Sequence, residues 1–298
     1  MMNTKLNLID TSNSVSIIGM RQAIYSIVLV VLFSIPVSMV QAAEGEPVQI
    51  MPLGDSTTAG YTDNPKWNHP FEFGYRSGLY RRLKKAGFDF VYAGDSKEPF
   101  NKRFGDPTHE GSVSPTLDLR KVKQDGHRGY GGWRIHAIQR HVAKWIRQDR
   151  PDIILMLIGI NGINAKSPEQ LDALVKKIYD ADKDVKLIVA QITPESKYNQ
   201  NLFDYNTYIK QTLVPTYASK GYTISTVDLY KHFLVDPDDP ESIDVKYFSN
   251  RSNHPTNLLY DKMAESWFQA IKSLLTNGKQ KAESGKGGVL SPAPHTTH

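Results

Sequence analysis

The sequence of 298 residues contains no cysteine. Its absence excludes disulfides, thiol nucleophiles, cysteine-ligated zinc sites and lipid attachment through cysteine. Hydrophobic residues make up 40% of the chain and charged residues 22%, an ordinary balance for a globular protein. We therefore expect a core large enough to hold the fold without disulfides or metal ions.

A strong excess of charge of one sign is also lacking. The formal net charge is +5, of which residues 1–42 contribute +1 and residues 278–298 contribute +2, leaving +2 for everything between them. So small a charge gives no electrostatic reason to expect a nucleic-acid partner.

The apolar run near the N-terminus is shorter than a membrane span. Ala23–Val37 follows Arg21 and precedes the small-residue segment Val40–Ala43. It has about 15 residues, against the roughly 20 that a bilayer requires. This order predicts a signal peptide over residues 1–42, cleaved near Ala42 or Ala43, and a secreted or periplasmic protein that touches membrane only if the segment is uncleaved. Residues 1–19 would be an upstream extension if translation begins at Met20.

Strand and helix patterns alternate through residues 46–277, which we predict to form one domain. Asp152–Ile158 is almost wholly apolar and is typical of a central parallel strand. The alternation predicts a three-layer α/β/α sandwich with a flavodoxin-like, parallel five-stranded sheet. Expected strands cover 48–53, 88–93, 152–158, 185–190 and 222–227, and expected helices cover 74–86, 133–148, 171–182, 201–220 and 255–275.

Three segments depart from this alternation. Residues 95–126 are polar and irregular, a length that often marks a functional loop. Pro215 should break the helix expected over 201–220 or lie near its end. Residues 278–298 are polar and rich in Gly, Pro and Ser, which predicts a disordered tail.

A serine stands where the first predicted strand ends, in Gly54-Asp55-Ser56. Glycine permits a sharp turn there, and a helix beginning at Ser56 would lend its amide groups to an anion. The same tripeptide is equally compatible with a plain strand-to-helix turn. We expect Asp55, between the glycine and the serine, to be a supporting residue of the site.

Two further segments could stabilise negative charge. Gly131-Gly132 precedes a helix and can leave backbone N–H groups exposed, and Asn161 follows the most buried strand, where its amide can donate. A flexible loop and a left-handed turn are the alternative interpretations. Late in the chain, His254 precedes the last helix and could return to the strand ends to deprotonate a serine.

These segments together resemble those of the SGNH/GDSL hydrolases, and within them carbohydrate esterase family 3, which includes acetylxylan esterases. The resemblance covers roughly residues 48–275 and implies Ser56 as nucleophile and His254 as general base. It implies an oxyanion hole of Ser56 N–H, Gly132 N–H and the Asn161 side-chain amide. The segments are MPLGDSTTAG, GYRSGLYRRLKKAGFDFVYAGDS, DGHRGYGGWRI, PDIILMLIGING, VAQITP and SNHPTNLLYDKMAESW.

The chain departs from the family pattern at two positions. Gly162 stands where Asp usually follows the asparagine, and Arg251 stands where Asp usually precedes the histidine by three residues. The usual group that orients the imidazole is therefore missing. A backbone carbonyl near Arg251 could replace it, giving a Ser–His dyad, and Asp244 is a second candidate.

The substrate is less sharply indicated. Trp67 and Tyr130 lie among polar residues near the site segments and are candidate sugar contacts, although packing is an equal alternative. The resemblance favours an O-acetylated carbohydrate, a small molecule or polysaccharide. We expect no cofactor and no metal, because His127, His136 and His141 have poor spacing for a shared ion. The competing functions are a lipid or thioester hydrolase and a carbohydrate-binding protein with weak or lost catalysis.

Overall fold

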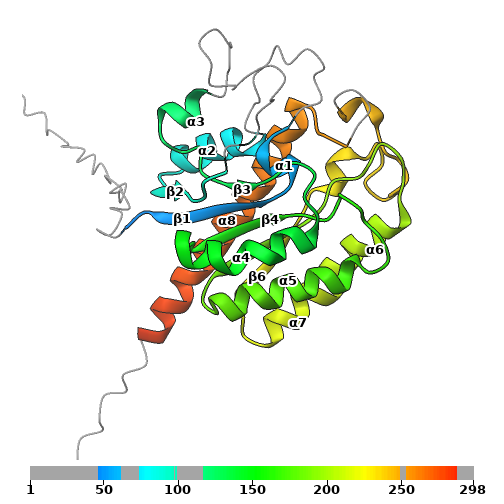
Figure 1. Ribbon diagram of the computed structural model, residues 1–298. Coiled ribbons are helices and arrows are strands. Elements are labelled where there is room, and N and C mark those ends of the chain that lie inside the picture. The colour runs from blue at the N-terminus through cyan, green and yellow to red at the C-terminus, as the bar shows by residue number, and fades with distance from the viewer. Residues whose placement is uncertain (1–45, 62–73, 97, 99–116, 249–252, 287–298) are drawn as a thin grey trace, which may run out of the picture. The chain divides into compact units, whose positions relative to one another are not determined.

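A computed structural model describes residues 46–61, 74–96, 98, 117–248 and 253–286. Five strands form a parallel sheet in the order β2-β1-β4-β5-β6 (Figure 1). This is the predicted flavodoxin-like order, because the second strand lies at the edge beside the first. The strands are β1 (Val48–Gly54), β2 (Phe90–Tyr92), β4 (Ile153–Leu157), β5 (Lys186–Gln191) and β6 (Ile224–Asp228).

A sixth, very short strand was not predicted. β3 (Arg128–Gly129) pairs with β1 at Leu53 and Gly54, beyond the residues that β1 pairs with β2. An arginine and a glycine carry neither the alternation nor the β propensity that marks a strand in sequence. Its pairing brings the following glycines to the carboxyl end of β1.

Helices cover both faces of the sheet (Figure 1). α2 packs against α8 on one face, and α4 packs against α5 on the other. The three predicted layers are therefore confirmed. The α-helices are α1 (Ser56–Ala59), α2 (Tyr75–Lys85), α3 (Leu117–Lys121), α4 (Ile135–Asp149), α5 (Ser167–Ala181), α6 (Gln200–Tyr208), α7 (Val214–Ser219) and α8 (Asn257–Lys286).

Pro215 does not interrupt the helical course of residues 200–219. α6 continues into a π-helical segment, Ile209–Leu213, and then into α7. Pro215 lies in the first turn of α7. The first turn of a helix tolerates the missing N–H of proline, and the wider π turn accommodates its ring without a break in the chain.

α8 is longer than the sequence suggested. It reaches Lys286, well into the segment 278–298 that we predicted to be disordered, whereas residues 287–298 lie outside the described residues. No proline occurs between Pro255 and Pro292, so nothing in the sequence forces the helix to stop earlier. The predicted signal segment 1–42 also lies outside the described residues. Within the described residues, no helix is long and apolar enough to cross a membrane.

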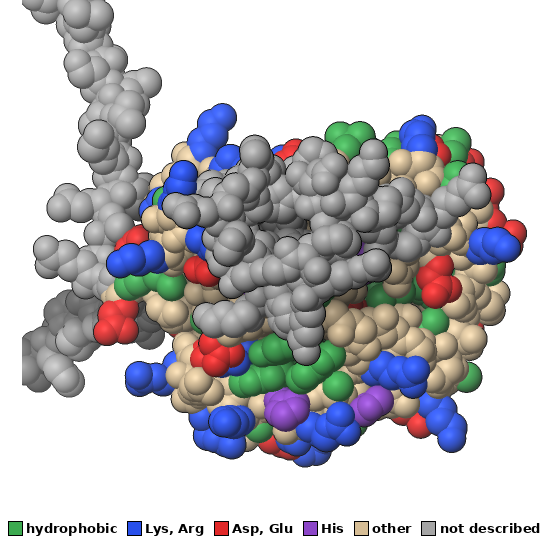
Figure 2. Space-filling view, turned by 45° about the horizontal axis from the view of Figure 1, so that its top comes forward, with side chains coloured by type: hydrophobic (Ala, Val, Ile, Leu, Met, Phe, Trp, Pro, Cys, Tyr) green, Lys and Arg blue, Asp and Glu red, His purple; other side chains and the backbone are tan. Residues whose placement is uncertain are grey.

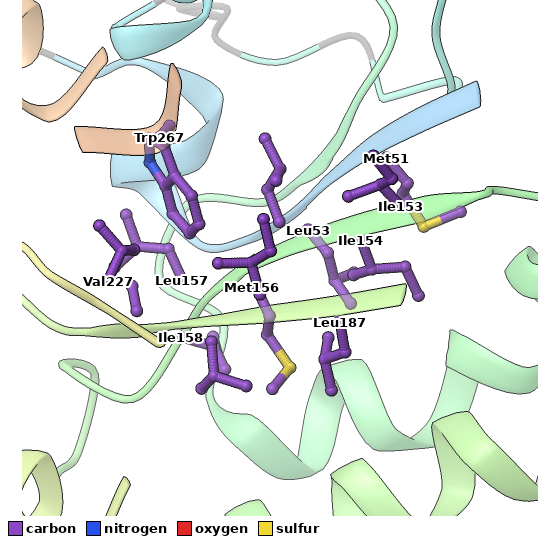
Figure 3. Packing of buried hydrophobic residues seen from close by; sticks show 14 of the residues in the cluster. Met51, Leu53, Ile153, Ile154, Met156, Leu157, Ile158, Leu187, Val227 and Trp267 are labelled. Atoms are coloured by element: carbon purple, nitrogen blue, oxygen red, sulfur yellow. The ribbon is translucent and has the colours of Figure 1, made fainter. Parts of the chain in front are cut away.

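The core lies on both sides of β4, whose five residues are all buried. Figure 3 shows Ile154 and Met156 packed among side chains of the neighbouring strands and of α8, including Leu187 and Trp267. Trp267 is completely buried. The almost wholly apolar segment 152–158 thus has the central position that its composition predicted.

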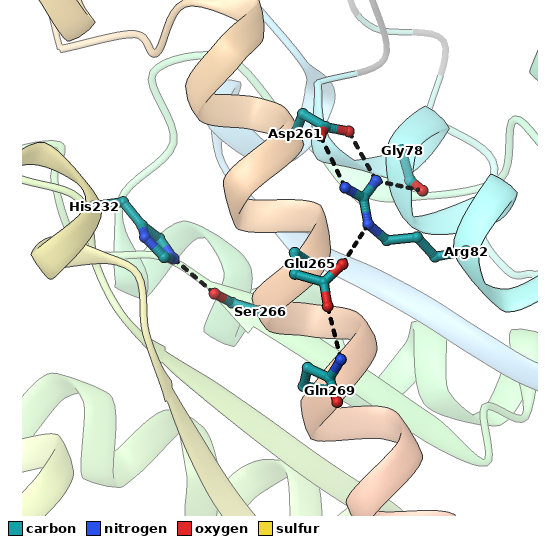
Figure 4. A network of polar contacts seen from close by, with 7 residues as sticks. All are labelled: Gly78, Arg82, His232, Asp261, Glu265, Ser266 and Gln269. Carbon is teal, nitrogen blue, oxygen red and sulfur yellow. Dashed lines mark hydrogen bonds and ion pairs between the residues drawn. The ribbon is translucent and has the colours of Figure 1, made fainter.

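Polar contacts fix α8 to α2 (Figure 4). The guanidinium of Arg82 donates two hydrogen bonds of 2.8 Å to Asp261 and one of 2.7 Å to Glu265. On the other side of α8, His232 is hydrogen-bonded to Ser266 at 2.7 Å. Because α8 begins at Asn257, soon after His254, these contacts also fix the approach of that histidine to the sheet.

A buried ion pair connects β3 with the end of α4. Arg128, only 2% exposed, donates to Asp149 from Nε at 2.7 Å and from Nη2 at 2.9 Å, and Asp95 also accepts from it. Its guanidinium lies 5.1 Å from the ring centre of Trp145. A buried charge held this way is costly to leave unpaired.

We predict that Arg128→Met lowers the free energy of unfolding by about 3 kcal/mol, because it leaves the Asp149 carboxylate without its partner. Urea denaturation followed by circular dichroism measures the change. Lys176→Met, which removes an exposed pair with Asp180, is the matched control and should change the midpoint little. Equal midpoints for the two variants would contradict a structural role for the Arg128 pair.

Candidate active site

Ser56 lies at the carboxyl end of β1, as the first residue of the one-turn helix α1. Gly54 has no room for a side chain, since a Cβ there would lie 1.9 Å from the carbonyl oxygen of Leu157 on β4. Asp55 caps α1 by accepting a hydrogen bond of 3.0 Å from Thr57 N–H. The sharp turn expected from Gly54-Asp55-Ser56 is thus present, and it presents Ser56 beyond the sheet.

Arg76 of α2 holds the other end of this turn. Its side chain is completely buried and donates to the carbonyl oxygens of Thr58 at 3.2 Å and Ala59 at 3.1 Å. A third bond of 3.1 Å reaches the carbonyl of Asp125. Burial lowers the pKa of this guanidinium to about 10, so it stays charged at neutral pH. Sequence analysis missed it, although Arg76 shares a helical face with the predicted core residues Leu79 and Leu83.

His254 meets Ser56, as predicted. Its Nε2 lies 2.8 Å from Ser56 Oγ, although the two residues are almost 200 positions apart in the chain. The ring of Tyr61 stacks on the imidazole with 5.9 Å between ring centres and 24° between planes. Tyr61 is itself held by Tyr260 of α8, whose hydroxyl donates to the Tyr61 carbonyl at 2.7 Å.

The loop before α4 and the turn after β4 lie against each other. Asn161 Nδ2 donates to the carbonyl of Trp133 at 3.0 Å, and a primary amide carries a second hydrogen that this bond does not use. Gly132 has a φ of +73°, a conformation that glycine adopts without strain. Within the described residues, no hydrogen-bond acceptor is found for Ser56 N–H or Gly132 N–H. All three groups predicted for an oxyanion hole thus retain a hydrogen to donate.

Glu98 connects this loop with the ring over His254. One oxygen of its carboxylate accepts hydrogen bonds from Gly131 N–H and, at 3.3 Å, from the Tyr61 hydroxyl. Burial raises the pKa of this carboxyl above its usual value. Glu98 lies in the polar segment 95–126, where no motif distinguishes it from the neighbouring charged residues, so the sequence could not single it out.

The carboxyl group of Asp55 has an unusually high pKa. It is 2% exposed, and burial raises the pKa of its carboxyl to about 7 despite the hydrogen bond from Thr57 N–H and the nearby charge of His254. An acid with such a pKa gains and loses its proton near neutral pH.

Two groups were predicted to replace the missing aspartate, a backbone carbonyl near Arg251 and the carboxylate of Asp244. Arg251 lies outside the described residues, so a carbonyl near it stays a prediction. Asp244 is engaged elsewhere, since it accepts from Lys246 N–H at 3.1 Å and forms an ion pair with Lys246 Nζ. That engagement lowers the pKa of Asp244 and counts against it as the group that orients His254.

The two candidate sugar contacts also differ. Trp67 lies outside the described residues. Tyr130 packs within an aromatic cluster, 4.3 Å from Trp133 and 5.4 Å from Trp145 between ring centres. Sugar contact by Tyr130 stays a prediction. Trp133 is one of the residues that line a surface cavity.

The histidines considered for a metal ion are dispersed in the described structure. His127 is buried, bonded through Nε2 to the Glu98 carbonyl at 2.8 Å, and accepts from Gly129 N–H through Nδ1 at 3.0 Å. Burial lowers its pKa well below the usual value. No group of three or more potential metal ligands occurs among the residues that the structure describes.

Comparison with known proteins bears directly on this arrangement. The family model described as GDSL-like lipase/acylhydrolase matches residues 50–267, most of the chain. A curated multidomain esterase of Ruminococcus flavefaciens is 26% identical over 263 residues. The match covers 79% of this chain but only 30% of that larger protein.

Solved structures agree with the fold. A family 3 carbohydrate esterase of Clostridium thermocellum is 24% identical, with a TM-score of 0.58 and coverage of 78% of this chain and 98% of that one. A family 3 carbohydrate esterase of Talaromyces cellulolyticus is 18% identical, with a TM-score of 0.58 and coverage of 77% and 99%. The family predicted from the motifs is thereby confirmed: the chain belongs to the GDSL-like lipase/acylhydrolase family, and its class of enzyme is that of the carboxylic ester hydrolases.

Proposed function

We propose that the chain hydrolyses O-acetyl groups on carbohydrate, with Ser56 as nucleophile and His254 as general base. The observation that carries this proposal is the 2.8 Å contact between Ser56 Oγ and His254 Nε2. A serine becomes a strong nucleophile when an adjacent base accepts its proton. The contact lies at the carboxyl end of the parallel strands, where open α/β sheets bind ligands.

In the first half of the reaction, His254 Nε2 takes the Ser56 proton as Oγ attacks the acetyl carbonyl carbon. The carbonyl oxygen becomes negative and accepts hydrogen bonds from Ser56 N–H, Gly132 N–H and the second Asn161 amide hydrogen. Collapse breaks the bond to the sugar oxygen, which leaves with the proton from His254. The product is an acetyl-enzyme on Ser56.

In the second half, a water molecule gives a proton to His254 and attacks the acetyl carbon. The same three donors stabilise the second oxyanion. Breaking the bond to Ser56 Oγ releases acetic acid, and Ser56 regains its proton from His254.

Asp55 supports the charged form of His254. The two groups are close enough for their charges to interact, and the carboxylate would stabilise the imidazolium that forms in each half-reaction. We therefore assign Asp55 as the carboxyl group that supports a Ser56–His254 dyad in this chain, in which Arg251 stands at the position of the usual aspartate.

The carbohydrate part of the proposal rests on two supports. The similar solved structures include two that are named family 3 carbohydrate esterases. The half-buried ring of Trp133 directly follows Gly132 in the loop before α4, and aromatic faces suit the C–H faces of sugars. Export through the segment around residues 21–43, itself a prediction, would bring the enzyme to polysaccharide outside the cell.

A serine-directed fluorophosphonate tests the nucleophile. We expect the probe to label the intact chain and to fail on Ser56→Ala, with acetyl-ester hydrolysis lost in parallel by at least about 10³-fold. Ser219→Ala, an exposed serine at the end of α7, is the matched control and should label normally. Absence of labelling in the intact chain would favour a binding protein, and faster hydrolysis of long-chain acyl esters than of acetyl esters would favour a lipid hydrolase.

Asn161→Ala tests the oxyanion hole. We expect kcat to fall about 10²- to 10³-fold, because one preorganised donor is lost from the transition state. KM should change little, and the thermal unfolding midpoint should remain close to that of the intact chain. An unchanged kcat would remove Asn161 from the reaction.

The raised pKa of Asp55 predicts how stability depends on pH. Unfolded chains lose this proton near pH 4 and the folded chain keeps it to about pH 7, so the folded state binds more protons across that window. Stability relative to Asp55→Asn, which can still cap α1, should therefore fall as pH rises from 4 to 7, on the order of 4 kcal/mol in total. Parallel urea-denaturation curves for the two proteins across this range would contradict the shift.

A further inference from the structure

A cavity lined by cationic side chains adjoins the loop before α4, which carries Gly132. It has a volume of about 400 Å³ and is lined by Gly132, Trp133, Arg134, His136, Ala137, Arg140 and His141. Gly132 belongs both to this cavity and to the predicted oxyanion hole, so the two sites are contiguous. On the face seen in Figure 2, histidine side chains lie among Lys and Arg side chains beside a hydrophobic group.

The cations of this cavity have no acidic partners within the described structure. No aspartate or glutamate lines the cavity, and neither Arg134 nor Arg140 forms an ion pair or a side-chain hydrogen bond in the described part of the chain. The acid of the adjoining loop, Glu98, is already bonded to Gly131 N–H and Tyr61. Two arginines that face solvent beside a reaction site are free to bind an incoming anion.

Arg134 lies against the turn that carries Asn161. A Cβ added to Gly162 would lie 2.8 Å from Arg134 Nε and 2.9 Å from its Cζ. Gly162 also has a φ of +74°, which disfavours most side chains. The glycine therefore leaves the space that the guanidinium occupies, at one of the two positions where the family resemblance leads us to expect an aspartate. This chain combines a missing acid with an unpaired arginine at the same point.

We propose that this cavity binds a carboxylate of the acylated carbohydrate, so that the preferred substrate carries uronic acid residues near the acetyl group. Arg134 is the specificity-determining residue, with Arg140 contributing to the same charge. The planar guanidinium fork matches a carboxylate through two parallel hydrogen bonds, a geometry that a neutral sugar cannot reproduce. Trp133 also lines the cavity, with its ring stacked against Tyr130 at 4.3 Å between ring centres. The proposal rests on the proposed esterase function.

The experiment uses one acetylated oligosaccharide containing uronic acid and its carboxyl-reduced counterpart, which differ only in charge. We expect the intact chain to hydrolyse the acidic form with a kcat/KM about tenfold higher or more, a preference that weakens as salt is added. Arg134→Gln should abolish most of this preference. Arg147→Gln, an exposed arginine farther along α4, is the control and should keep it.

Gly162→Asp tests the same idea without removing the arginine. The Asp side chain would displace the Arg134 guanidinium, which lies 2.8 Å from the added Cβ, and would leave a negative charge beside it. The preference for the acidic substrate should therefore fall as it does in Arg134→Gln. Rates that fall equally on both substrates in Arg134→Gln would overturn the proposal, because the arginine would then support the geometry of Asn161 rather than bind an anion.

A binding measurement separates this proposal from the esterase function. Ser56→Ala should bind the acidic oligosaccharide more tightly than its carboxyl-reduced form in isothermal titration calorimetry, and the added Arg134→Gln change should remove the difference. Selective binding without any hydrolysis by the intact chain would refute the esterase and keep the carboxylate site. Hydrolysis by the intact chain, together with equal affinities of Ser56→Ala for the two oligosaccharides, would keep the esterase and refute the carboxylate site.

Discussion

The buried guanidinium of Arg76 is the interaction on which the reactive arrangement depends. α1 has a single turn, too short to be stable by its own hydrogen bonds, and its carbonyls would otherwise lack partners in a dry environment. Arg76 binds the carbonyls of Thr58 and Ala59, while Asp55 caps the opposite end. The Arg76 guanidinium and the Asp55 carboxyl group, at the two ends of one turn, therefore hold Ser56 at a fixed height above the sheet.

The partner of Ser56 is placed by a separate set of forces. α8 is packed into the core through Trp267 and joined to α2 by the Arg82 contacts. α2 also supplies Arg76, so one helix determines the positions of both ends of the Ser56–His254 pair. Tyr260 adds a third connection, since it holds the Tyr61 ring against the imidazole. A change in the packing of α2 against α8 would thus displace both reacting groups together.

The sequence predicted the sheet order and the residues of the pair because both depend on local signals. The apolar segment 152–158, the glycine turn before Ser56 and the glycines before α4 each have a physical reason to occur where they do. Sequence analysis did not identify Arg76 and Glu98, because their roles depend on contacts between segments that are distant in the sequence. Tyr130 shows the opposite limit. It stands among polar residues in the sequence, yet it packs against Trp133, three positions away, and Trp145, fifteen positions away.

The site around Ser56 carries little negative charge. Two positions where the family resemblance leads us to expect aspartate hold Arg251 and Gly162, so the site has fewer carboxylates than its pattern implies. Glu98, which accepts from Gly131 N–H beside Gly132, has a pKa raised by burial and is thus less strongly ionised. Less negative charge near the oxyanion donors strengthens their hold on a developing oxyanion, because repulsion is reduced. The same deficit lets an anionic substituent approach Arg134 without repulsion, so one electrostatic property would serve both the reaction and the choice of substrate.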